Sequence, residues 1–162
     1  MSTLPENVVK DIEAMMSKFD KNNDGEITWD EVVERLKENK NCKDPYFAAF
    51  SMFSALDKNQ DRKISLAEVQ NHKLEIYAKK CESVIKRDVK NMLKEYDGNK
   101  DGKITWDEVC DFFRKDPEVG EKNCELNTKY LFQSMDKNND KVITRDELRA
   151  FSMRFNNLHP SQ

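Results

Sequence analysis

The sequence predicts an all-α protein built from two pairs of helix–loop–helix units. Three observations support this class. The same twelve-residue pattern occurs four times, at residues 20–31, 57–68, 97–108 and 136–147. Apolar residues recur at helical spacing before and after each copy. The copies start 37, 40 and 39 residues apart, so the chain is an internal repeat of one supersecondary unit.

The first half of the chain supplies two of these units. Thr3 followed by Glu6 resembles a capping box for a helix that leads into the first loop. Asp44 and Pro45 predict a stop and restart before the helix that leads into the second loop. The residues at helical spacing in this half are Ile12, Met15, Met16 and Phe19; Val32, Val33 and Leu36; Ala49, Met52, Phe53 and Leu56; and Val69 and Ile76.

The second half repeats the arrangement. No glycine or proline occurs from Leu66 to Tyr96, so one helix can run from the second loop towards the third. Asp116 and Pro117 separate the third unit from the fourth. We expect the long helix to be packed for much of its length. The sequence allows this helix to be either straight or bent near residue 80. The apolar or small residues at helical spacing are Tyr77, Cys81, Val84, Ile85, Val89, Met92, Leu93 and Tyr96; Val109, Phe112 and Phe113; Thr128, Leu131, Phe132 and Met135; and Leu148, Phe151 and Phe155.

Odd and even copies differ in a regular way. The first and third copies share the sequence ITWDEV and a glycine at the sixth loop position, where the second and fourth have Arg62 and Lys141. This alternation indicates a duplicated pair of units. It predicts an N-terminal domain over residues 1–80 and a C-terminal domain over residues 81–162.

Oxygen-bearing side chains recur at fixed positions of each loop. Positions one, three, five and twelve are Asp, Asn, Asp and Glu in every copy, position seven would offer a main-chain carbonyl, and the Thr or Ser at position nine would act through a water. Such a ring of hard oxygens suits Ca²⁺, and a bidentate glutamate favours Ca²⁺ over Mg²⁺. The predicted metal ligands are Asp20, Asn22, Asp24, Glu26 and Glu31; Asp57, Asn59, Asp61, Lys63 and Glu68; Asp97, Asn99, Asp101, Lys103 and Glu108; and Asp136, Asn138, Asp140, Val142 and Glu147.

The eighth loop position is isoleucine in every copy. A β-branched residue there suits a short strand, which predicts pairing of the first loop with the second and of the third with the fourth. A solvated acidic turn without a metal explains one such loop, but it does not explain four matched copies with helical flanks.

With these motifs, the chain resembles proteins that contain four EF-hands, of the calmodulin, troponin C and sarcoplasmic calcium-binding type. The pattern D-x-N-x-D-G-x-I-T-x-x-E of the first and third copies carries the resemblance, which extends over nearly the whole chain. It implies up to four bound Ca²⁺ ions. Occupation of the loops by Mg²⁺ in a resting cell, when calcium is low, is an open alternative.

The sixth loop position is expected to have a positive φ angle. Glycine adopts it freely, whereas Arg62 and Lys141 should each pay about 1–2 kcal/mol. We therefore expect the first and third loops to bind most strongly, with dissociation constants on the order of 10⁻⁷–10⁻⁵ M, and the other two more weakly.

Two functions agree with calcium binding. A sensor would expose apolar grooves that bind an amphipathic helix of a target protein, and a cytosolic buffer of the sarcoplasmic type would change little in shape. We favour the sensor, because three carboxylates per loop and two non-glycine turns suggest moderate affinity. The expected groove residues, which ordinary core packing also explains, are Met15, Met16, Phe19, Met52 and Phe53; and Phe112, Phe113, Phe151, Met153 and Phe155.

Other classes fit the sequence less well. No catalytic constellation or phosphate-binding loop occurs, so we expect no enzyme, and a photoprotein of the same superfamily ranks low. The 28 basic and 31 acidic residues give a net charge of −3, which does not suggest nucleic-acid binding. Neither a membrane anchor nor an export signal is recognisable, so a cytoplasmic monomer is expected. The four cysteines are expected as reduced thiols, with Cys81 and Cys110 half-buried, and Trp29 and Trp106 as exposed helix starts.

Overall fold

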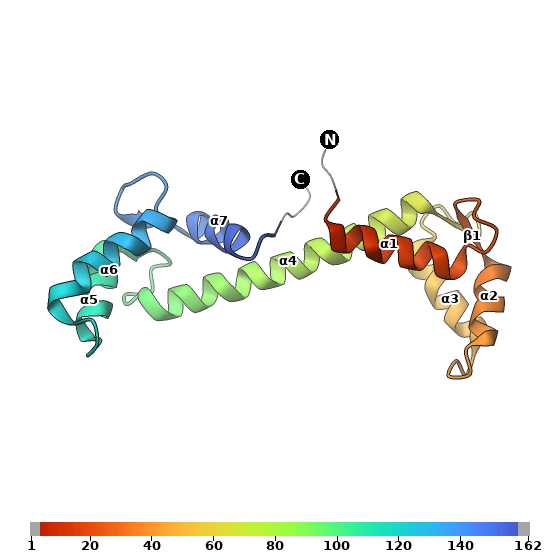
Figure 1. Cartoon of the computed structure of the whole chain (residues 1–162), viewed down its shortest axis with the longest axis horizontal. Coiled ribbons are helices and arrows are strands. Elements are labelled where there is room, and N and C mark those ends of the chain that lie inside the picture. The colour runs from red at the N-terminus through yellow and green to blue at the C-terminus, as the bar shows by residue number, and fades with distance from the viewer. Residues whose placement is uncertain (1–3, 159–162) are drawn as a thin grey trace. The chain divides into compact units, whose positions relative to one another are not determined.

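The computed structural model describes residues 4–158, and its elements alternate as helix, loop and helix (Figure 1). The predicted all-α class with two short two-stranded sheets is confirmed. The helices are α1 (Glu6–Phe19), α2 (Trp29–Glu38), α3 (Pro45–Leu56), α4 (Leu66–Tyr96), α5 (Trp106–Lys115), α6 (Gly120–Met135) and α7 (Arg145–Phe155). The strands are β1 (Glu26–Thr28), β2 (Lys63–Ser65), β3 (Ile104–Thr105) and β4 (Val142–Ile143).

The chain divides into two compact units, one ending at Lys79 and the other beginning at Lys80, so that the division falls within α4. In each unit the two loops are joined by their eighth positions, as predicted. β1 pairs antiparallel with β2, with Ile27 opposite Ile64. β3 pairs antiparallel with β4, with Ile104 opposite Ile143.

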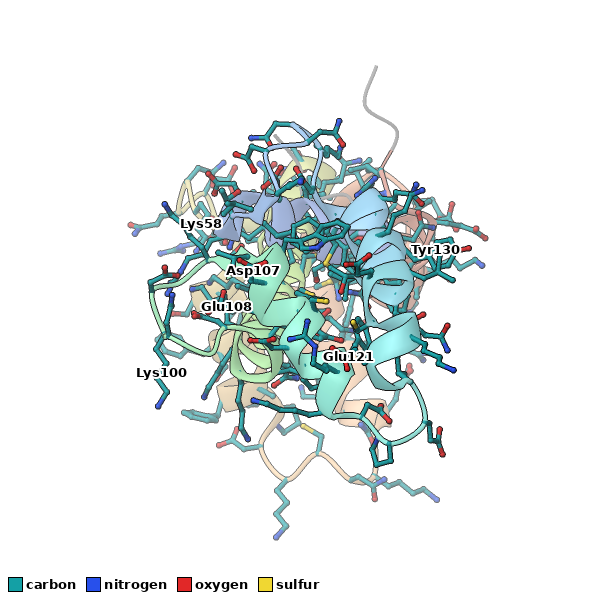
Figure 2. The ribbon with its side chains drawn as sticks, turned by 90° about the vertical axis from the view of Figure 1, so that its left-hand side faces the viewer. Lys58, Lys100, Asp107, Glu108, Glu121 and Tyr130 are labelled. Atoms are coloured by element: carbon teal, nitrogen blue, oxygen red, sulfur yellow. The ribbon has the colours of Figure 1, made fainter. Side chains whose placement is uncertain are left out.

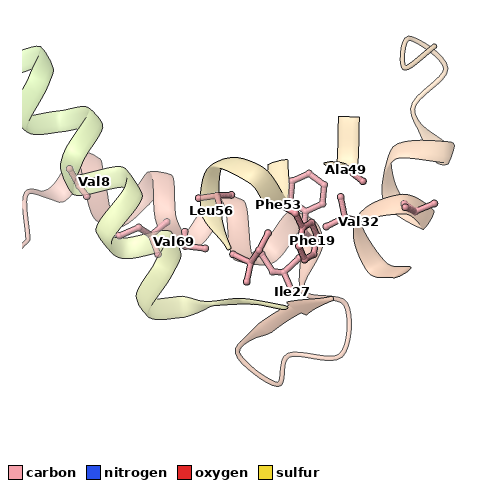
Figure 3. Close-up of a cluster of buried hydrophobic side chains, with 11 residues drawn as sticks. Val8, Phe19, Ile27, Val32, Ala49, Phe53, Leu56 and Val69 are labelled. Carbon is pink, nitrogen blue, oxygen red and sulfur yellow. The ribbon is translucent and has the colours of Figure 1, made fainter. Parts of the chain in front are cut away.

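The core of the first unit surrounds the β1–β2 pair (Figure 3). Both isoleucines of the pair are fully buried, and α2 packs against α3 beside them. Asp44 caps α3, because its Oδ1 accepts a hydrogen bond from the Phe47 N–H at 2.9 Å. The buried residues of this core are Val8, Ile12, Phe19, Ile27, Val32, Val33, Ala49, Phe53, Leu56, Ile64 and Val69.

The core of the second unit surrounds the β3–β4 pair in the same way. α5 packs against α6, and α6 packs against α7. The buried residues of this core are Ile104, Val109, Phe132, Met135, Ile143 and Leu148. Half-buried side chains from the end of α4 and from α5 to α7 pack against them, namely Val89, Met92, Leu93, Tyr96, Trp106, Phe113, Leu131 and Phe151.

The expected exposure of the two tryptophans was wrong, and one expected helix cap lies outside the described residues. Trp29 and Trp106 are not exposed: they are half-buried, with ring centroids 5.3 Å from Phe53 and 5.1 Å from Phe132. Ile76 and Phe155 share helical faces with core residues but are 50% and 76% exposed. Helical spacing shows the face that a residue occupies, whereas burial also needs an element opposite that face. Thr3 lies outside the described residues, and the residue at the N-cap of α1 is Pro5.

Polar contacts join α7 to α4 within the second unit. Arg149 donates two hydrogen bonds to the Glu82 carboxylate, at 3.0 and 2.8 Å. Asp88 Oδ2 accepts hydrogen bonds from Ser152 Oγ at 2.8 Å and from Asn156 Nδ2 at 2.7 Å. We call these five residues the α4–α7 clasp. It holds the helix that follows the fourth loop against the helix that precedes the third.

The clasp predicts a loss of stability in acid. Burial alone would raise the pKa of Asp88, but hydrogen bonds from Ser152, Asn156 and Arg87 outweigh it and hold the pKa below its usual value. A carboxylate whose pKa is lowered by folding stabilises the protein above its unfolded pKa, and that stability is lost as the pH falls below about 4. Asp88→Asn should therefore lower the free energy of unfolding by about 1–3 kcal/mol at neutral pH, and by less in acid. Urea unfolding of the calcium-free protein at both pH values measures this difference.

The exposed Glu125→Gln variant is the matched control for the lost charge. It should unfold like the unmodified protein at both pH values. An Asp88→Asn effect that is the same in acid and at neutral pH would contradict the proposed contribution of the ionised carboxylate.

Candidate metal-binding loops

The ninth and twelfth residues of each loop cap the helix that follows it. Thr28 is the N-cap of α2: its Oγ1 accepts a hydrogen bond from the Glu31 N–H at 3.4 Å, and the Glu31 carboxylate accepts one from the Thr28 N–H at 2.9 Å. The same capping box begins α5 and α7, and Ser65 and Glu68 make the same two bonds at the start of α4. Only a water-mediated role was predicted for the ninth residue. The T-x-x-E spacing is the signal that could have revealed the cap.

The first, third and fifth residues are brought together in each loop. In the first loop, Asp20 Oδ2 accepts a hydrogen bond from the Gly25 N–H at 3.0 Å. Asn22 Nδ2 donates to Asp24 Oδ2 at 2.8 Å, and the Glu26 N–H donates to Asp24 Oδ1 at 2.9 Å. Equivalent bonds occur in the other three loops. The seventh residue thus contributes its backbone N–H to the loop, and in the first unit the side chains of the two seventh residues, Glu26 and Lys63, form an ion pair at 2.6 Å.

The twelfth-position glutamates lie against the start of their loops. Glu31 Oε1 accepts a hydrogen bond from the Lys21 N–H at 3.1 Å, and Glu108 Oε1 accepts one from the Asn99 N–H at 3.1 Å. Figure 2 labels Glu108 beside Asp107 on the first turn of α5. Burial alone would raise the pKa of all four glutamates, but the hydrogen bonds that they accept outweigh it and leave each pKa below its usual value. All four are therefore ionised at neutral pH.

The donor set of these loops fits a hard cation. Each loop offers carboxylate, amide, hydroxyl and main-chain oxygens, without sulfur or imidazole ligands. In the described part of the chain, no three aspartate, glutamate, histidine or cysteine side chains are arranged to hold a metal ion. However, Asp57 Oδ1, at the first position of the second loop, is a buried oxygen without a hydrogen-bond partner. A cation in that loop would satisfy this oxygen.

The backbone at the sixth loop position is left-handed in all four loops, which confirms the expectation for Arg62 and Lys141. The φ angles are +84° at Gly25, +67° at Arg62, +86° at Gly102 and +64° at Lys141. The fourth position is left-handed as well, a feature that was not predicted. Asparagine tolerates this conformation better than most residues, and the asparagines found there in two of the four loops were the available signal. The residues at the fourth position are Asn23, Gln60, Lys100 and Asn139.

Replacing Arg62 by glycine should stabilise the calcium-saturated first unit by about 1 kcal/mol, because the Cβ atom is removed from a left-handed position. Urea unfolding in saturating calcium measures the gain. Arg62→Ala removes the same charge but keeps the Cβ atom, so it should give no gain. Equal stabilisation by both variants would show that charge, and not backbone strain, limits this loop.

Comparisons with known proteins agree with this geometry. Models of the EF-hand domain pair, the EF hand domain and the EF hand match residues 46–114, 11–39 and 129–152. The chain is 42% identical over 151 residues to calcium-binding protein A of Dictyostelium discoideum, covering 93% of this chain and 96% of that protein. Calcium-binding protein 4b of the same organism is 33% identical over 145 residues, covering 88% and 86% of the two chains. From these matches and from the four helix-flanked loops, the chain belongs to the EF-hand family.

Proposed function

We propose that this protein binds Ca²⁺ through its four loops and acts as a cytoplasmic calcium sensor. The observation that carries the proposal is the fourfold recurrence of one oxygen donor set between two helices, the second of which is capped by loop residues. The Dictyostelium relatives named as calcium-binding proteins support it. In each loop, the side chains at positions one, three, five and twelve and the carbonyl at position seven would hold the ion. When bound, Ca²⁺ supplies two positive charges that neutralise the clustered carboxylates.

The charges of the loops support a ranking of the four sites. The first loop has five acidic residues and one basic residue, and the third has four acidic and two basic. The fourth loop has four acidic and three basic residues, whereas the second has three of each. A dication is attracted more strongly by a more negative loop. The first and third loops are therefore proposed as the stronger sites, and their glycines at the sixth position favour the same order.

Filling four sites would change the electrostatics of the whole chain. The formal charge of −3 would become +5, because each ion adds two positive charges. Such a reversal changes which partners the protein attracts over a distance of about 8–10 Å at physiological salt.

Half-buried apolar side chains give the sensor function a surface to expose. Met15, Met16 and Met52 pack at the margin of the first core. In the second unit, a hollow of about 290 Å³ is lined by Met92, Phe151 and Phe155, with Asp88 among its polar neighbours. An amphipathic helix is the proposed partner, because its apolar side chains fit hollows of this kind. Phe155 is already 76% exposed and would be one contact point.

The α4–α7 clasp favours the alternative function of a calcium buffer. A movement of α7 away from α4 would break the Arg149–Glu82 pair and both hydrogen bonds to Asp88. These bonds resist the rearrangement that a sensor needs. A buffer would keep the clasp closed whether or not the loops are filled.

Calorimetry combined with binding of an apolar fluorescent dye separates the two functions. A sensor should bind Ca²⁺ and show more dye fluorescence with calcium than with a chelator. The Glu31→Gln and Glu108→Gln double variant is the control, and it should lose most of that response at moderate calcium. Four filled sites with unchanged dye fluorescence would reject the sensor and leave the buffer, whereas no heat of binding would reject both.

The remaining parts of the proposal concern partners and location. None of the helices in the described part of the chain combines the length and apolar character needed to cross a membrane. We propose a monomer without catalytic activity that acts through its protein partner. Sedimentation with and without calcium tests the monomer, since a calcium-dependent dimer would have twice the mass.

A further inference from the structure

Two cysteines outside the predicted ligand set meet between α5 and α6. Cys110 is the fifth residue of α5 and Cys124 the fifth residue of α6, and their Sγ atoms are 3.2 Å apart. Both side chains are nearly covered, at 6% and 2% exposure. Half-burial was expected for Cys110, and no pairing was expected, because the two positions form no short cysteine motif.

Contacts of the surrounding fold bring the two thiols together, and the Cys124 thiol also donates a hydrogen bond to the Glu121 carbonyl at 3.2 Å. The turn between the helices is closed by the Gly120 N–H, which donates to the Asp116 carbonyl at 2.9 Å, with φ of +60° at Gly120. The Thr128 hydroxyl donates to the Cys124 carbonyl at 2.7 Å. α5 and α6 lie side by side along this region (Figure 2). The contact between the thiols is therefore a property of the helix packing.

We propose that Cys110 and Cys124 are a redox modification site, at which a small disulfide oxidant converts the two thiols into an intramolecular disulfide. The sulfur atoms must approach by only about 1.2 Å to reach the bonding distance of roughly 2.05 Å. One cysteine thiolate attacks the oxidant, forms a mixed disulfide and releases one small thiolate. The second cysteine thiolate then attacks the protein sulfur and releases the other. The protein loses two protons and two electrons, and the oxidant gains them as two thiols.

The disulfide would act on the second unit through its stability. It would close a loop of about fifteen residues, from α5 to α6, and so restrict the unfolded chain. The midpoint of thermal unfolding of the second unit should rise by about 10–20 °C. Neither cysteine belongs to the predicted calcium ligands, so the site is independent of the proposed function.

The full chain is brought to equilibrium in buffers that differ in the ratio of reduced to oxidised glutathione. Each buffer is used once with calcium and once with a chelator. Remaining thiols are alkylated, and the protein is digested without reduction. Trypsin cuts at Arg114, Lys115 and Lys122, so the two cysteines fall in separate peptides unless a disulfide joins them. Mass spectrometry should find the joined peptides, lighter by two hydrogens than the sum of the free ones.

One cysteine outside the pair and one within it provide the controls. Cys42→Ala should keep the joined peptides, whereas Cys124→Ala should lose them. The result on the unmodified chain is decisive even if the Cys124 variant folds poorly. If Cys110 and Cys124 remain alkylatable, or carry only glutathione, in a buffer that fully modifies Cys42, the proposal is wrong. An unchanged unfolding temperature of the joined protein would overturn the stabilising role.

Discussion

Glu108→Gln should lower the calcium affinity of the third loop by at least roughly tenfold, or about 1.4 kcal/mol. The substitution removes one of three carboxylates that would face the ion. Glutamine still serves at the third position of a capping box, so the bonds between Thr105 and the start of α5 can remain. The loss should therefore appear mainly in calcium titration, with a smaller effect on the unfolding of the calcium-free protein, because an amide has one oxygen for the bonds that two carboxylate oxygens accept. The fluorescence of Trp106, at the tenth loop position, reports on this loop directly.

Asp107→Asn is the matched control for this variant. Asp107 is the adjacent acidic residue, it is exposed, and its substitution removes the same charge from the same turn of α5 (Figure 2). If Glu108 is a ligand, the control should change affinity only slightly, through screened electrostatics. Equal weakening by both variants would show that the loop senses total charge, and the assignment of the twelfth position as a ligand would fail.

Ile104→Ala should lower the free energy of unfolding of the second unit by about 2–5 kcal/mol. Ile104 is fully buried, lies opposite Ile143 in the β3–β4 pair and belongs to the core of this unit. The cost comes from lost apolar contacts and from the cavity left between the two loops. A domain typically has only about 5–15 kcal/mol of stability, so this variant should leave the second unit close to unfolding without calcium. Urea unfolding followed through Trp106, in a Trp29→Phe background, measures it.

Leu126→Ala is the control for the loss of an aliphatic side chain in the same unit. Leu126 lies on α6 and is 49% exposed, so its removal should change stability by about 0.5 kcal/mol or less. Ile104→Val, which removes one methyl group, should fall between the two at about 0.5–1.5 kcal/mol. Similar losses for Ile104→Ala and Leu126→Ala would contradict the placement of Ile104 at the centre of the core.

The loops were predictable because their determinants are local. Twelve residues contain the whole set of oxygen donors, the isoleucine that pairs with the neighbouring loop and the residue that turns the backbone. The strand pairs at Ile27–Ile64 and Ile104–Ile143 and the left-handed Arg62 and Lys141 therefore follow from spacing alone. The assignment of individual ligands stays a prediction.

The amino-acid sequence by itself determined the all-α class, the repeat and the identity of the oxygen donors, because the class and the donors depend on residues close together along the chain and the repeat on matching copies of one short segment. Apart from the two strand pairs, the tertiary structure alone decided which side chains distant along the chain meet. The Cys110–Cys124 contact, the partners of Asp88 and the burial of Trp106 against Phe132 belong to this group. Helical periodicity assigns each residue to a face, but the neighbour that covers this face depends on how separate helices pack, and no local pattern records that packing.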